Sequence, residues 1–400
     1  MPAPKKKQQQ HAPAIPEYLV VLVGVCAGAL LIAGIFLASN MRYFALSYDA
    51  MITQDAEGST TTMAAAIVPP PPPPTLDRDA YTRKLLYIAN NGLYEELFAT
   101  SSASSSTASS SIAAVPLSAE ELASTTKKLW PAKAAYPNAG ALLPFNRIVA
   151  YYGNFYSTQM GVLGQYPQEE MLSRLKEAAS EWEKADPQTP VIPAIDYIAM
   201  TAQGSAGADG TYRFRMPADQ IQHAIDLSRE VHGITILEVQ AGLSDLETEV
   251  ESLEPYLKEP DVHLAIDPEF HMVTKAPPGT VIGSVDGKEV NRAAAYLAKL
   301  VKENDLPPKI LIVHRFTLPM VTHTLEITPL PEVQIVMDMD GWGSPERKFG
   351  TYQQAIIPYP VQFTGFKLFY KNDVKPPSTH MLTPAEVLQL SPQPIFIQYQ

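Results

Sequence analysis

The sequence is poor in cysteine, in charge and in basic residues. Cys26 is the single cysteine among 400 residues, which excludes an intrachain disulfide and a cysteine-ligated zinc site. Charged residues make up 18%, fewer than the ~25% of an average soluble domain. Lysine and arginine number 30 against 42 acidic residues, for a net charge of −12. This balance argues against nucleic-acid binding, because that function requires a basic surface.

An apolar run without charges extends from Tyr18 to Ala38. It is long enough to cross about 30 Å of hydrocarbon as a helix, and longer than the ~7–15 apolar residues of a signal peptide. The tail before it, residues 1–17, carries three consecutive lysines, which favour a cytoplasmic N-terminus. We therefore expect residues 18–38 to form a single-pass signal anchor in the cell membrane, with the rest of the chain on the extracytoplasmic side. A cleaved signal peptide is the alternative.

Two stretches of low complexity come after the apolar run. Residues 39–75 include six consecutive prolines, Pro69–Pro74, which favour a stiff polyproline II rod. Residues 100–115 are mostly Ser, Thr and Ala and predict a flexible linker that buries no core. Between them, residues 76–99 mix apolar and charged residues in a way that predicts a short helical segment. We expect this disordered Pro/Ser-rich stalk, before residue 112, to add little to the stability of the C-terminal domain.

Short apolar runs alternate with amphipathic stretches in the rest of the chain. The runs cover 147–152, 191–199, 234–240, 262–270, 309–316, 333–340, 366–370 and 395–399. Continuous Val, Ile and Leu runs are typical of parallel strands that are buried on both faces. The stretches between them predict helices over 168–186, 217–232, 243–258 and 289–304, and a short helix from Thr383.

Eight strand–helix repeats in about 250 residues have the size and rhythm of a (β/α)8 TIM barrel. We therefore predict an α/β fold with a TIM-barrel domain over residues 116–400. A doubly wound open sheet is the alternative. However, the first predicted strand is followed by Gly153-Asn154-Phe155 and not by a G-x-G-x-x-G phosphate loop.

In such barrels the active site lies at the carboxyl ends of the strands. Polar and aromatic residues gather near the ends of the predicted strands, and we expect them to bind substrate. They are Tyr152, Asn154, Asp196, Glu238, Gln240, His271, His314, Arg315, Trp342, Lys367, Tyr370, Gln398 and Tyr399. Among them, Tyr152, Trp342 and Tyr399 are candidate platforms for stacking on sugar rings.

Carboxylates dominate the predicted mouth. Because strand side chains alternate, Asp267, Glu269 and His271 are expected on one face, as are Asp338 and Asp340. Several carboxylates at one mouth repel each other, so some of their pKa values rise or a cation lies among them. A protonated carboxyl beside an ionised one is the arrangement used to cleave glycosidic bonds. We predict Glu269 as general acid, Asp267 as its supporting carboxylate, and Asp338 or Asp340 as the second catalytic carboxylate.

Several segments carry a resemblance to known barrels. They are V-A-Y-Y-G-N-F, H-L-A-I-D-P-E-F-H-M, K-I-L-I-V-H-R-F-T, M-D-M-D-G-W-G and G-F-K-L-F-Y-K-N-D. With them, residues 145–400 resemble uncharacterised bacterial secreted or lipoprotein-type TIM barrels that look similar to glycoside hydrolases. A looser resemblance is to chitinase-type family 18 hydrolases, whose fourth strand reads D-x-x-D-x-D-x-E with the last Glu as acid. Aligned on Glu269, that pattern matches at Asp267, whereas Val262 and Ala265 stand where the family has aspartates.

These observations predict a membrane-anchored, glycoside-hydrolase-like barrel that acts on or binds cell-wall or surface polysaccharide, with no cofactor and no metal. The alternative is a catalytically inactive barrel that binds a glycan or a protein partner of the cell envelope. A metal-dependent hydrolase is a third hypothesis, which no H-x-H or H-E-x-x-H motif supports. Its ligands would come from Asp196, Glu238, Glu269, His271 and Asp338.

Overall fold

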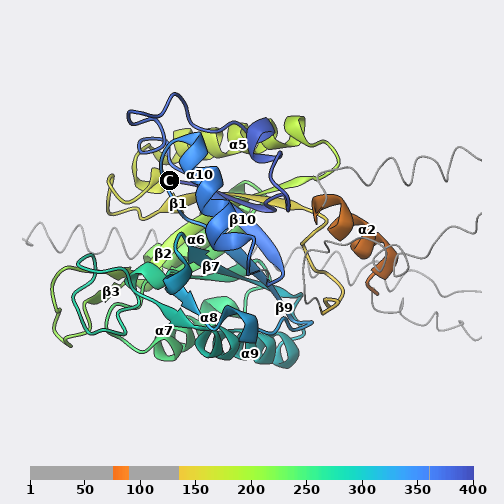
Figure 1. Cartoon of the computed structure of the whole chain (residues 1–400). Coiled ribbons are helices and arrows are strands. Elements are labelled where there is room, and N and C mark those ends of the chain that lie inside the picture. The colour runs from red at the N-terminus through yellow and green to blue at the C-terminus, as the bar shows by residue number, and fades with distance from the viewer. Residues whose placement is uncertain (1–74, 90–134, 360) are drawn as a thin grey trace, which may run out of the picture. The chain divides into compact units, whose positions relative to one another are not determined.

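A computed structural model describes residues 75–89, 135–359 and 361–400 of the chain. Eight parallel strands in these ranges close into a barrel (Figure 1). In order around the barrel they are β1 (Arg147–Gly153), β2 (Val191–Ala202), β4 (Ile234–Val239), β5 (Val262–Ile266), β7 (Lys309–Arg315), β9 (Val333–Met339), β10 (Phe363–Leu368) and β11 (Phe396–Tyr399). Because β1 pairs in parallel with both β2 and β11, the sheet has no open edge among these strands. The predicted TIM barrel is confirmed.

Helices lie between most of the strands, near the predicted positions. They are α5 (Gln168–Ala185), α6 (Ala218–Glu230), α7 (Leu246–Ser252), α8 (Glu254–Leu257), α9 (Gly287–Glu303), α10 (Pro345–Thr351) and α11 (Pro384–Val387). The helix predicted over 243–258 is divided into α7 and α8, with a proline in the first turn of α8. The start of α9 is fixed by a capping box, in which Asp286 accepts from Lys288 N at 3.0 Å and Glu289 accepts from Asp286 N at 2.8 Å.

Smaller elements fill the remaining connections. They are η2 (Val162–Gly164), β3 (Arg213–Arg215), η3 (Pro268–Phe270), β6 (Val285–Asp286), η4 (Leu318–Met320), β8 (Val321–Thr322), η5 (Thr324–Glu326) and the π-helix η6 (Tyr352–Ile356). Strand β3 pairs antiparallel with the end of β2, and β6 pairs with β8. The connection after β7 therefore consists of two 3-10 turns around a short strand.

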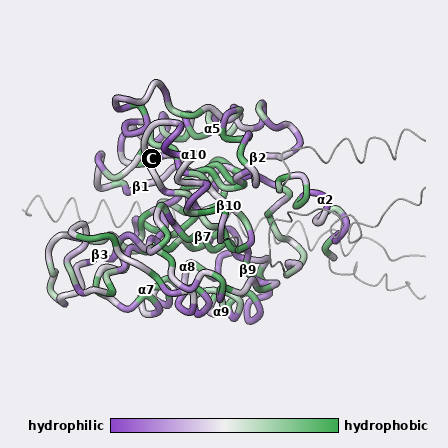
Figure 2. The backbone as a smooth tube through the Cα atoms, viewed as in Figure 1, coloured by the Kyte–Doolittle hydropathy of each residue, from purple (hydrophilic) through white to green (hydrophobic). Residues whose placement is uncertain are grey.

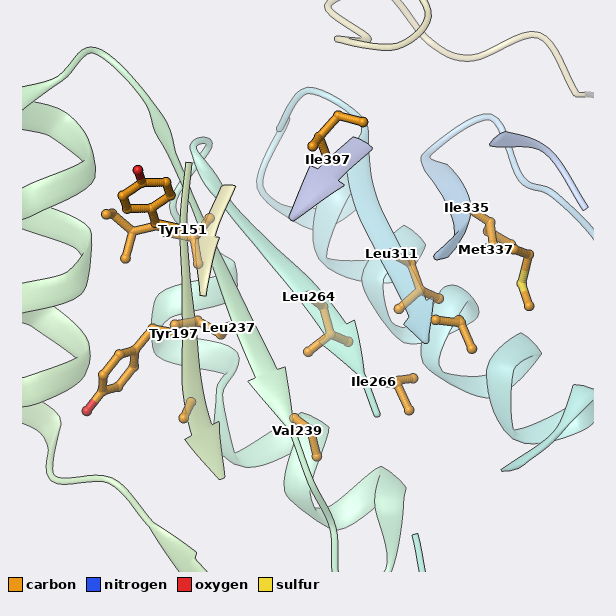
Figure 3. Close-up of a cluster of buried hydrophobic side chains, with 14 of the residues drawn as sticks. Tyr151, Tyr197, Leu237, Val239, Leu264, Ile266, Leu311, Ile335, Met337 and Ile397 are labelled. Carbon is orange, nitrogen blue, oxygen red and sulfur yellow. The ribbon is translucent and has the colours of Figure 1, made fainter. Parts of the chain in front are cut away.

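Alternation along the strands creates two apolar clusters. Outward side chains such as Tyr151, Leu237 and Met337 join the larger cluster, which packs against the helices (Figure 3). Inward side chains in the first half of the strands, such as Ile148 and Phe396, form the smaller cluster inside the barrel. Figure 2 shows the hydrophobic residues concentrated in the strands at the centre.

Helix α2 (Arg78–Ala89) covers the end of the barrel at which the strands begin (Figure 1). Its side chains Tyr81, Leu85 and Ile88 are buried in the same cluster as the inward residues of the strands. At its edge, Lys84 Nζ donates to Thr189 Oγ1 at 2.6 Å. We call this covered end the floor. The packing differs from the expectation that the region before residue 112 adds little to stability, because α2 completes the apolar core.

The predicted basic tail (1–17) and membrane segment (18–38) lie outside the described residues, as do the Ser/Thr/Ala-rich linker (100–115) and all but the last residue of the Pro-rich linker (39–75). Within the described ranges, the helices are too short or too polar to span a bilayer.

Candidate active site

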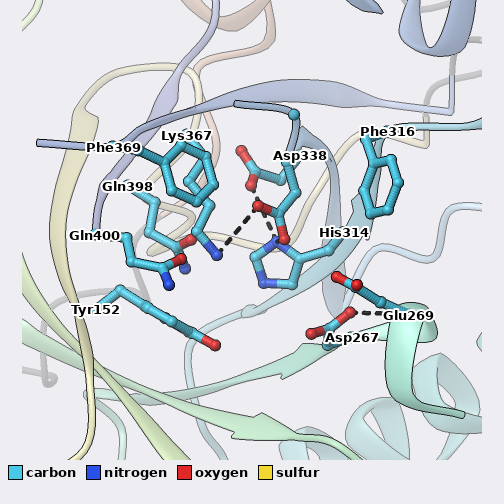
Figure 4. A network of polar contacts seen from close by, with 12 residues as sticks. Tyr152, Asp267, Glu269, His314, Phe316, Asp338, Lys367, Phe369, Gln398 and Gln400 are labelled. Atoms are coloured by element: carbon cyan, nitrogen blue, oxygen red, sulfur yellow. Dashed lines mark hydrogen bonds and ion pairs between the residues drawn. The ribbon is translucent and has the colours of Figure 1, made fainter. Parts of the chain in front are cut away.

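Each barrel strand turns one polar side chain inward, at or just after the carboxyl end in seven strands and midway along the strand in β2. These residues are Tyr152, Asp196, Glu238, Asp267, His314, Asp338, Lys367 and Gln398, and none is more than 4% exposed. They form a polar layer directly above the apolar floor, and Figure 4 shows several of them converging. All eight belong to the set predicted from the sequence for the mouth.

His314 lies at the centre of the polar layer. Its Nε2 is 3.0 Å from Glu238 Oε2. Its Nδ1 is 3.0 Å from Asp338 Oδ2 and 3.6 Å from Asp340 Oδ2. Burial lowers the pKa of the imidazole. The charge of Glu238 and the hydrogen bonds to Asp338 and Glu238 raise it by a larger amount, so the net pKa is well above its usual value. Burial raises the pKa of Glu238, yet His314 lowers it more and the net pKa is below its usual value. The pair is therefore an imidazolium and a carboxylate.

Lys367 is the second cation of the layer. Its Nζ is 3.2 Å from Asp340 Oδ1 and 3.9 Å from the centre of the Tyr152 ring, a cation–π geometry. Burial lowers the pKa of the ammonium, while Asp340 and Glu238 raise it above its usual value.

Glu238 also accepts hydrogen bonds from neutral side chains. The Tyr152 hydroxyl donates to Glu238 Oε1 at 3.0 Å, and Gln240 Nε2 donates to the same oxygen at 3.1 Å. Gln240 thus supports Glu238 from the side.

The remaining inward carboxyls resist ionisation. Burial is the main cause that raises the pKa of Asp196, Asp267 and Asp338. Gln398 Nε2 donates to Asp196 Oδ2 at 2.6 Å. The other carboxyl oxygens of Asp196 and Asp338 are buried and have no hydrogen-bond partner among the described residues. Among the described residues, His314 and Lys367 are the two cations of the layer, and they are fewer than its carboxyls, so protonation of some carboxyls limits the net charge of the layer.

Three residues of the layer could hold a metal ion. Asp196, Glu238 and His314 place one ligand atom each within 4.8 Å of one another, and imidazole with carboxylate is a donor set that zinc and iron accept. Both ring nitrogens of His314 already face carboxylate oxygens at 3.0 Å. A metal would therefore have to replace the proton that the imidazolium now directs at Glu238.

A pocket of about 550 Å³ opens above the polar layer. Six of the predicted residues line it, namely Tyr152, Asp267, Glu269, Asp340, Trp342 and Lys367. Asp338, Glu238 and His314 do not; they lie beneath it. Trp342 is 45% exposed, and Arg347 Cζ lies 5.2 Å from the centre of its ring.

Glu269 differs from Asp267 and Asp340, the other acids of the pocket, in being only half-buried. It lies in η3, where Asp267 Oδ1 accepts a hydrogen bond from the Glu269 backbone N at 2.9 Å. Burial, and secondly the charge of Asp340, raise the pKa of the half-buried Glu269 carboxyl to about 6. The pocket therefore combines a carboxyl that holds its proton up to a pH of about 6 with Asp340, which forms an ion pair with Lys367.

Sequence reasoning missed other lining residues. Phe316, Thr317, Phe369, Asn372, Arg347, Ile282 and Gln400 also face the pocket. Five of them, all but Arg347 and Ile282, follow an observed strand by one to four positions, so their place directly after strand ends was the available signal. These five side chains carry no charge, and nothing else in the sequence distinguished them.

Three predicted residues face outward and do not reach the pocket. Arg315 follows the inward His314, so alternation turns it out of the barrel, where Nη2 donates to the Leu318 carbonyl at 2.9 Å. The Tyr399 hydroxyl accepts from Trp182 Nε1 at 2.9 Å, and the Tyr370 ring stacks on Tyr399 with centroids 5.2 Å apart. The prediction of Tyr399 as a sugar platform is therefore wrong, because the ring packs against helix α5.

Asn154 and His271 also lie away from the pocket. Asn154 Oδ1 accepts from Tyr156 N at 2.8 Å and stabilises the loop after β1. His271 Nδ1 is 2.8 Å from the Ser284 carbonyl. The expected common face of Asp267 and His271 is lost because the chain leaves the strand for the 3-10 turn η3, in which strict alternation no longer holds.

The protein-family models contain no match to this sequence, and neither do the curated proteins. Solved structures of glycoside hydrolases are distantly similar. One is a cellulase with 13% identity and a TM-score of 0.33, and the match covers 56% of this chain and 65% of that chain. Another is a family GH5 xyloglucan-specific endo-β-1,4-glucanase from a metagenomic library in complex with cellotriose, with 11% identity and a TM-score of 0.34, over 65% of this chain and 88% of that chain. A third is a ruminal GH26 endo-β-1,4-mannanase with 11% identity and a TM-score of 0.31, over 64% of this chain and 59% of that chain. The match spans just under two thirds of the cellulase, and at this identity the similarity concerns the fold alone.

Proposed function

We propose that the protein hydrolyses glycosidic bonds of an extracytoplasmic polysaccharide at the mouth of its barrel. The observation that carries the proposal is the pair of unlike carboxyls in one pocket. Glu269 has a pKa raised to about 6, and Asp340 is paired with the Lys367 ammonium at 3.2 Å. A carboxyl with a raised pKa that shares a pocket with a second carboxyl is what both retaining and inverting glycosidases require.

Glu269 is the proposed general acid. Below a pH of about 6 its carboxyl carries the proton that the leaving glycosidic oxygen must receive. Asp267 is a positioning residue, because its side chain fixes the backbone N of Glu269 and so the direction of η3.

Asp340 is the proposed second carboxylate. Lys367, held against the Tyr152 ring, forms an ion pair with Asp340 at 3.2 Å and fixes the direction of its carboxylate. Asp340 then either attacks the anomeric carbon or takes a proton from the attacking water. Asp338 is the other candidate from the sequence, but it lies beneath the pocket, bonded to His314. We assign Asp338 the role of orienting the imidazolium.

The substrate we propose is a cell-wall or surface polysaccharide. Support comes from the exposed Trp342 at the pocket rim, whose apolar ring matches the apolar face of a sugar. In this proposal residues 18–38 anchor the chain in the cell membrane and the barrel lies on the extracytoplasmic side.

The test measures reducing ends released from cell-wall polysaccharides and β-glucans by the full chain. We expect Glu269→Gln to lower turnover by at least about a hundredfold while glycan binding persists. The matched control is Glu303→Gln, an exposed acid at the end of α9, which should retain full activity. Wild-type protein that binds glycan without turnover would contradict the proposal and favour the inactive binding barrel.

A further inference from the structure

Lys348 in α10 and Asp373 in the loop after β10 form a buried ion pair close to the pocket at the barrel mouth. Lys348 Nζ lies 2.8 Å from Asp373 Oδ2, and both side chains are 1% exposed. Neither residue lines the pocket. A buried pair of this kind is often no more stabilising than apolar side chains of similar volume. We call this ion pair the clamp, because its other contacts join two segments that do line the pocket.

The Lys348 ammonium contacts the backbone of both segments. Its Nζ donates to the Gly341 carbonyl at 2.9 Å and to the Lys367 carbonyl at 2.7 Å. Gly341 directly follows Asp340 in the sequence, so one ammonium links the backbone of Lys367 to that of the residue next to its ion-pair partner. With Asp373 as the third acceptor, all three N–H groups of the ammonium are satisfied.

The Asp373 carboxylate joins the same two segments. Its Oδ1 accepts a hydrogen bond from Gly343 N at 2.9 Å, and its Oδ2 accepts one from Phe369 N at 2.9 Å. Gly341 and Gly343 flank Trp342 in the sequence, and Phe369 lines the pocket. The clamp therefore holds the backbone on both sides of the exposed indole.

These contacts begin where the pairing of two strands stops. The ladder between β9 and β10 ends at Met339 and Phe366, so Asp340 and Lys367 lie just beyond it. Toward β7, the backbone N of Asp340 still donates to the Arg315 carbonyl at 3.2 Å. Toward β10, the clamp supplies links between the two backbones that the ladder no longer provides.

We propose that Lys348 and Asp373 are positioning residues, which set the direction of the Asp340 carboxylate and the place of Trp342 in the pocket. The inference rests on the proposed function, in which Asp340 is the second carboxylate. A misplacement of about 1 Å at a reacting group can lower a rate about a hundredfold. Because the clamp does not line the pocket, it acts on the reaction through the two segments and not through contact with the substrate.

Lys348→Met tests the clamp, and Arg147→Met is its matched control. Arg147 is a buried cation at the start of β1, 3.0 Å from Asp186 Oδ2 and at the floor end of the barrel. Both substitutions remove the cation of a buried ion pair, so both should lower the Tm. At a temperature at which circular dichroism shows each variant folded, only Lys348→Met should lower kcat, by at least about tenfold. The change in KM should be smaller, because the direction of Asp340 matters in the transition state.

Asp373→Asn is a second variant, which keeps the size of the side chain and should also lower kcat. An NMR measurement that needs no turnover separates the clamp from the proposed function. The indole N–H resonance of Trp342, assigned with Trp342→Phe, should shift in Lys348→Met and Asp373→Asn and stay in place in Arg147→Met.

The possible failures can be told apart. A wild type without turnover would contradict the proposed hydrolase, and the Trp342 resonance would then decide whether the clamp orders the pocket. In an active enzyme, full kcat in a folded Asp373→Asn variant would overturn the inference and leave the proposed function standing. A Trp342 resonance that stays in place in both clamp variants would overturn it in either case.

Discussion

The Nε2 atom of His314 and the Oε2 atom of Glu238 lie 3.0 Å apart, on side chains with no exposed surface. The pKa of His314 is higher in the folded protein than the unfolded value of 6.5. Its charge therefore stabilises the folded protein in full below pH 6.5, and this stabilisation is lost as the pH rises through the folded pKa. The pKa of Glu238 is lower in the folded protein than the unfolded value of 4.5. Its charge therefore stabilises the folded protein in full above pH 4.5, and this stabilisation is lost as the pH falls through the folded pKa. Between pH 4.5 and 6.5 both contributions are therefore present in full.

Removal of the imidazolium should be strongly destabilising. We expect His314→Gln to lower the free energy of unfolding at pH 6 by about 3–5 kcal/mol, because it leaves a buried carboxylate unpaired. The control is His263→Gln, at the start of β5, where a buried ring accepts from Ile310 N at 3.0 Å and forms no ion pair among the described residues. That variant should lose only about 1 kcal/mol. Urea unfolding measures both, and equal losses would contradict the ion pair.

The two buried histidines should also differ in NMR titration. His314 should remain doubly protonated at neutral pH, because carboxyls surround it. Burial, and then the nearby Lys309, lower the pKa of His263 to about 3, so it should be neutral at pH 5. Imidazole nitrogen shifts report both states. A His314 ring that loses its proton between pH 6 and 7 would argue against a cationic centre.

Replacing Glu269 should have a pH-dependent effect on stability. Its folded pKa of about 6 lies above the unfolded value of 4.5, so its favourable contribution is present below pH 4.5 and lost as pH rises through 6. Discounted for partial exposure, the penalty at pH 8 is about 1 kcal/mol. Glu269→Gln should therefore raise the Tm by about 1–4 °C at pH 8 and not at pH 4.5. A buried structural role for Glu269 predicts a lower Tm at both values.

Gly365 should tolerate no side chain. A Cβ at this inward position of β10 would lie 2.9 Å from Phe396 Cδ1 and nearer still to Asp338 Oδ1. We expect Gly365→Ala to destabilise by about 1–3 kcal/mol and to disturb the Asp338–His314 contact. Gly350→Ala in α10 meets nothing within 4 Å and should stabilise by about 0.5–1 kcal/mol. Thermal unfolding of the two alanine variants should thus show shifts of opposite sign.

Helix α2 should contribute measurably to stability. Leu85 is 7% exposed in the floor cluster, and Leu85→Ala should cost about 2–5 kcal/mol. Arg83 lies on the exposed face of the same helix, so Arg83→Ala should change stability by less than about 0.5 kcal/mol. Chemical denaturation of both variants tests the packing, and a neutral Leu85→Ala would show that α2 detaches in solution.

The strands could be predicted because their apolar runs are continuous. The same continuity made three polar residues easy to notice, because an ionisable residue inside an apolar run needs polar partners in the barrel interior. They are Asp196, His314 and Lys367. It was harder to predict which of two adjacent residues faces inward. Arg315 and Tyr399 each neighbour an inward residue, and an arginine or tyrosine is compatible with either side of the strand.

Features that depend on distant parts of the chain could not be predicted from local pattern. The spacing of Leu85 and Ile88 indicated a helix, but its docking depends on the apolar surface that the barrel floor presents. The failure at His271 came from η3, a turn of three residues whose effect on alternation a sequence pattern does not reveal.

The position of α2 determines how the barrel is held. The chain enters the folded body through this helix, so a force applied at residues before Arg78 acts on the end where the strands begin. The pocket of about 550 Å³ lies at the opposite end. Under the proposed function, an attachment to the membrane through α2 would therefore leave the pocket on the side of the barrel that faces away from the point of attachment.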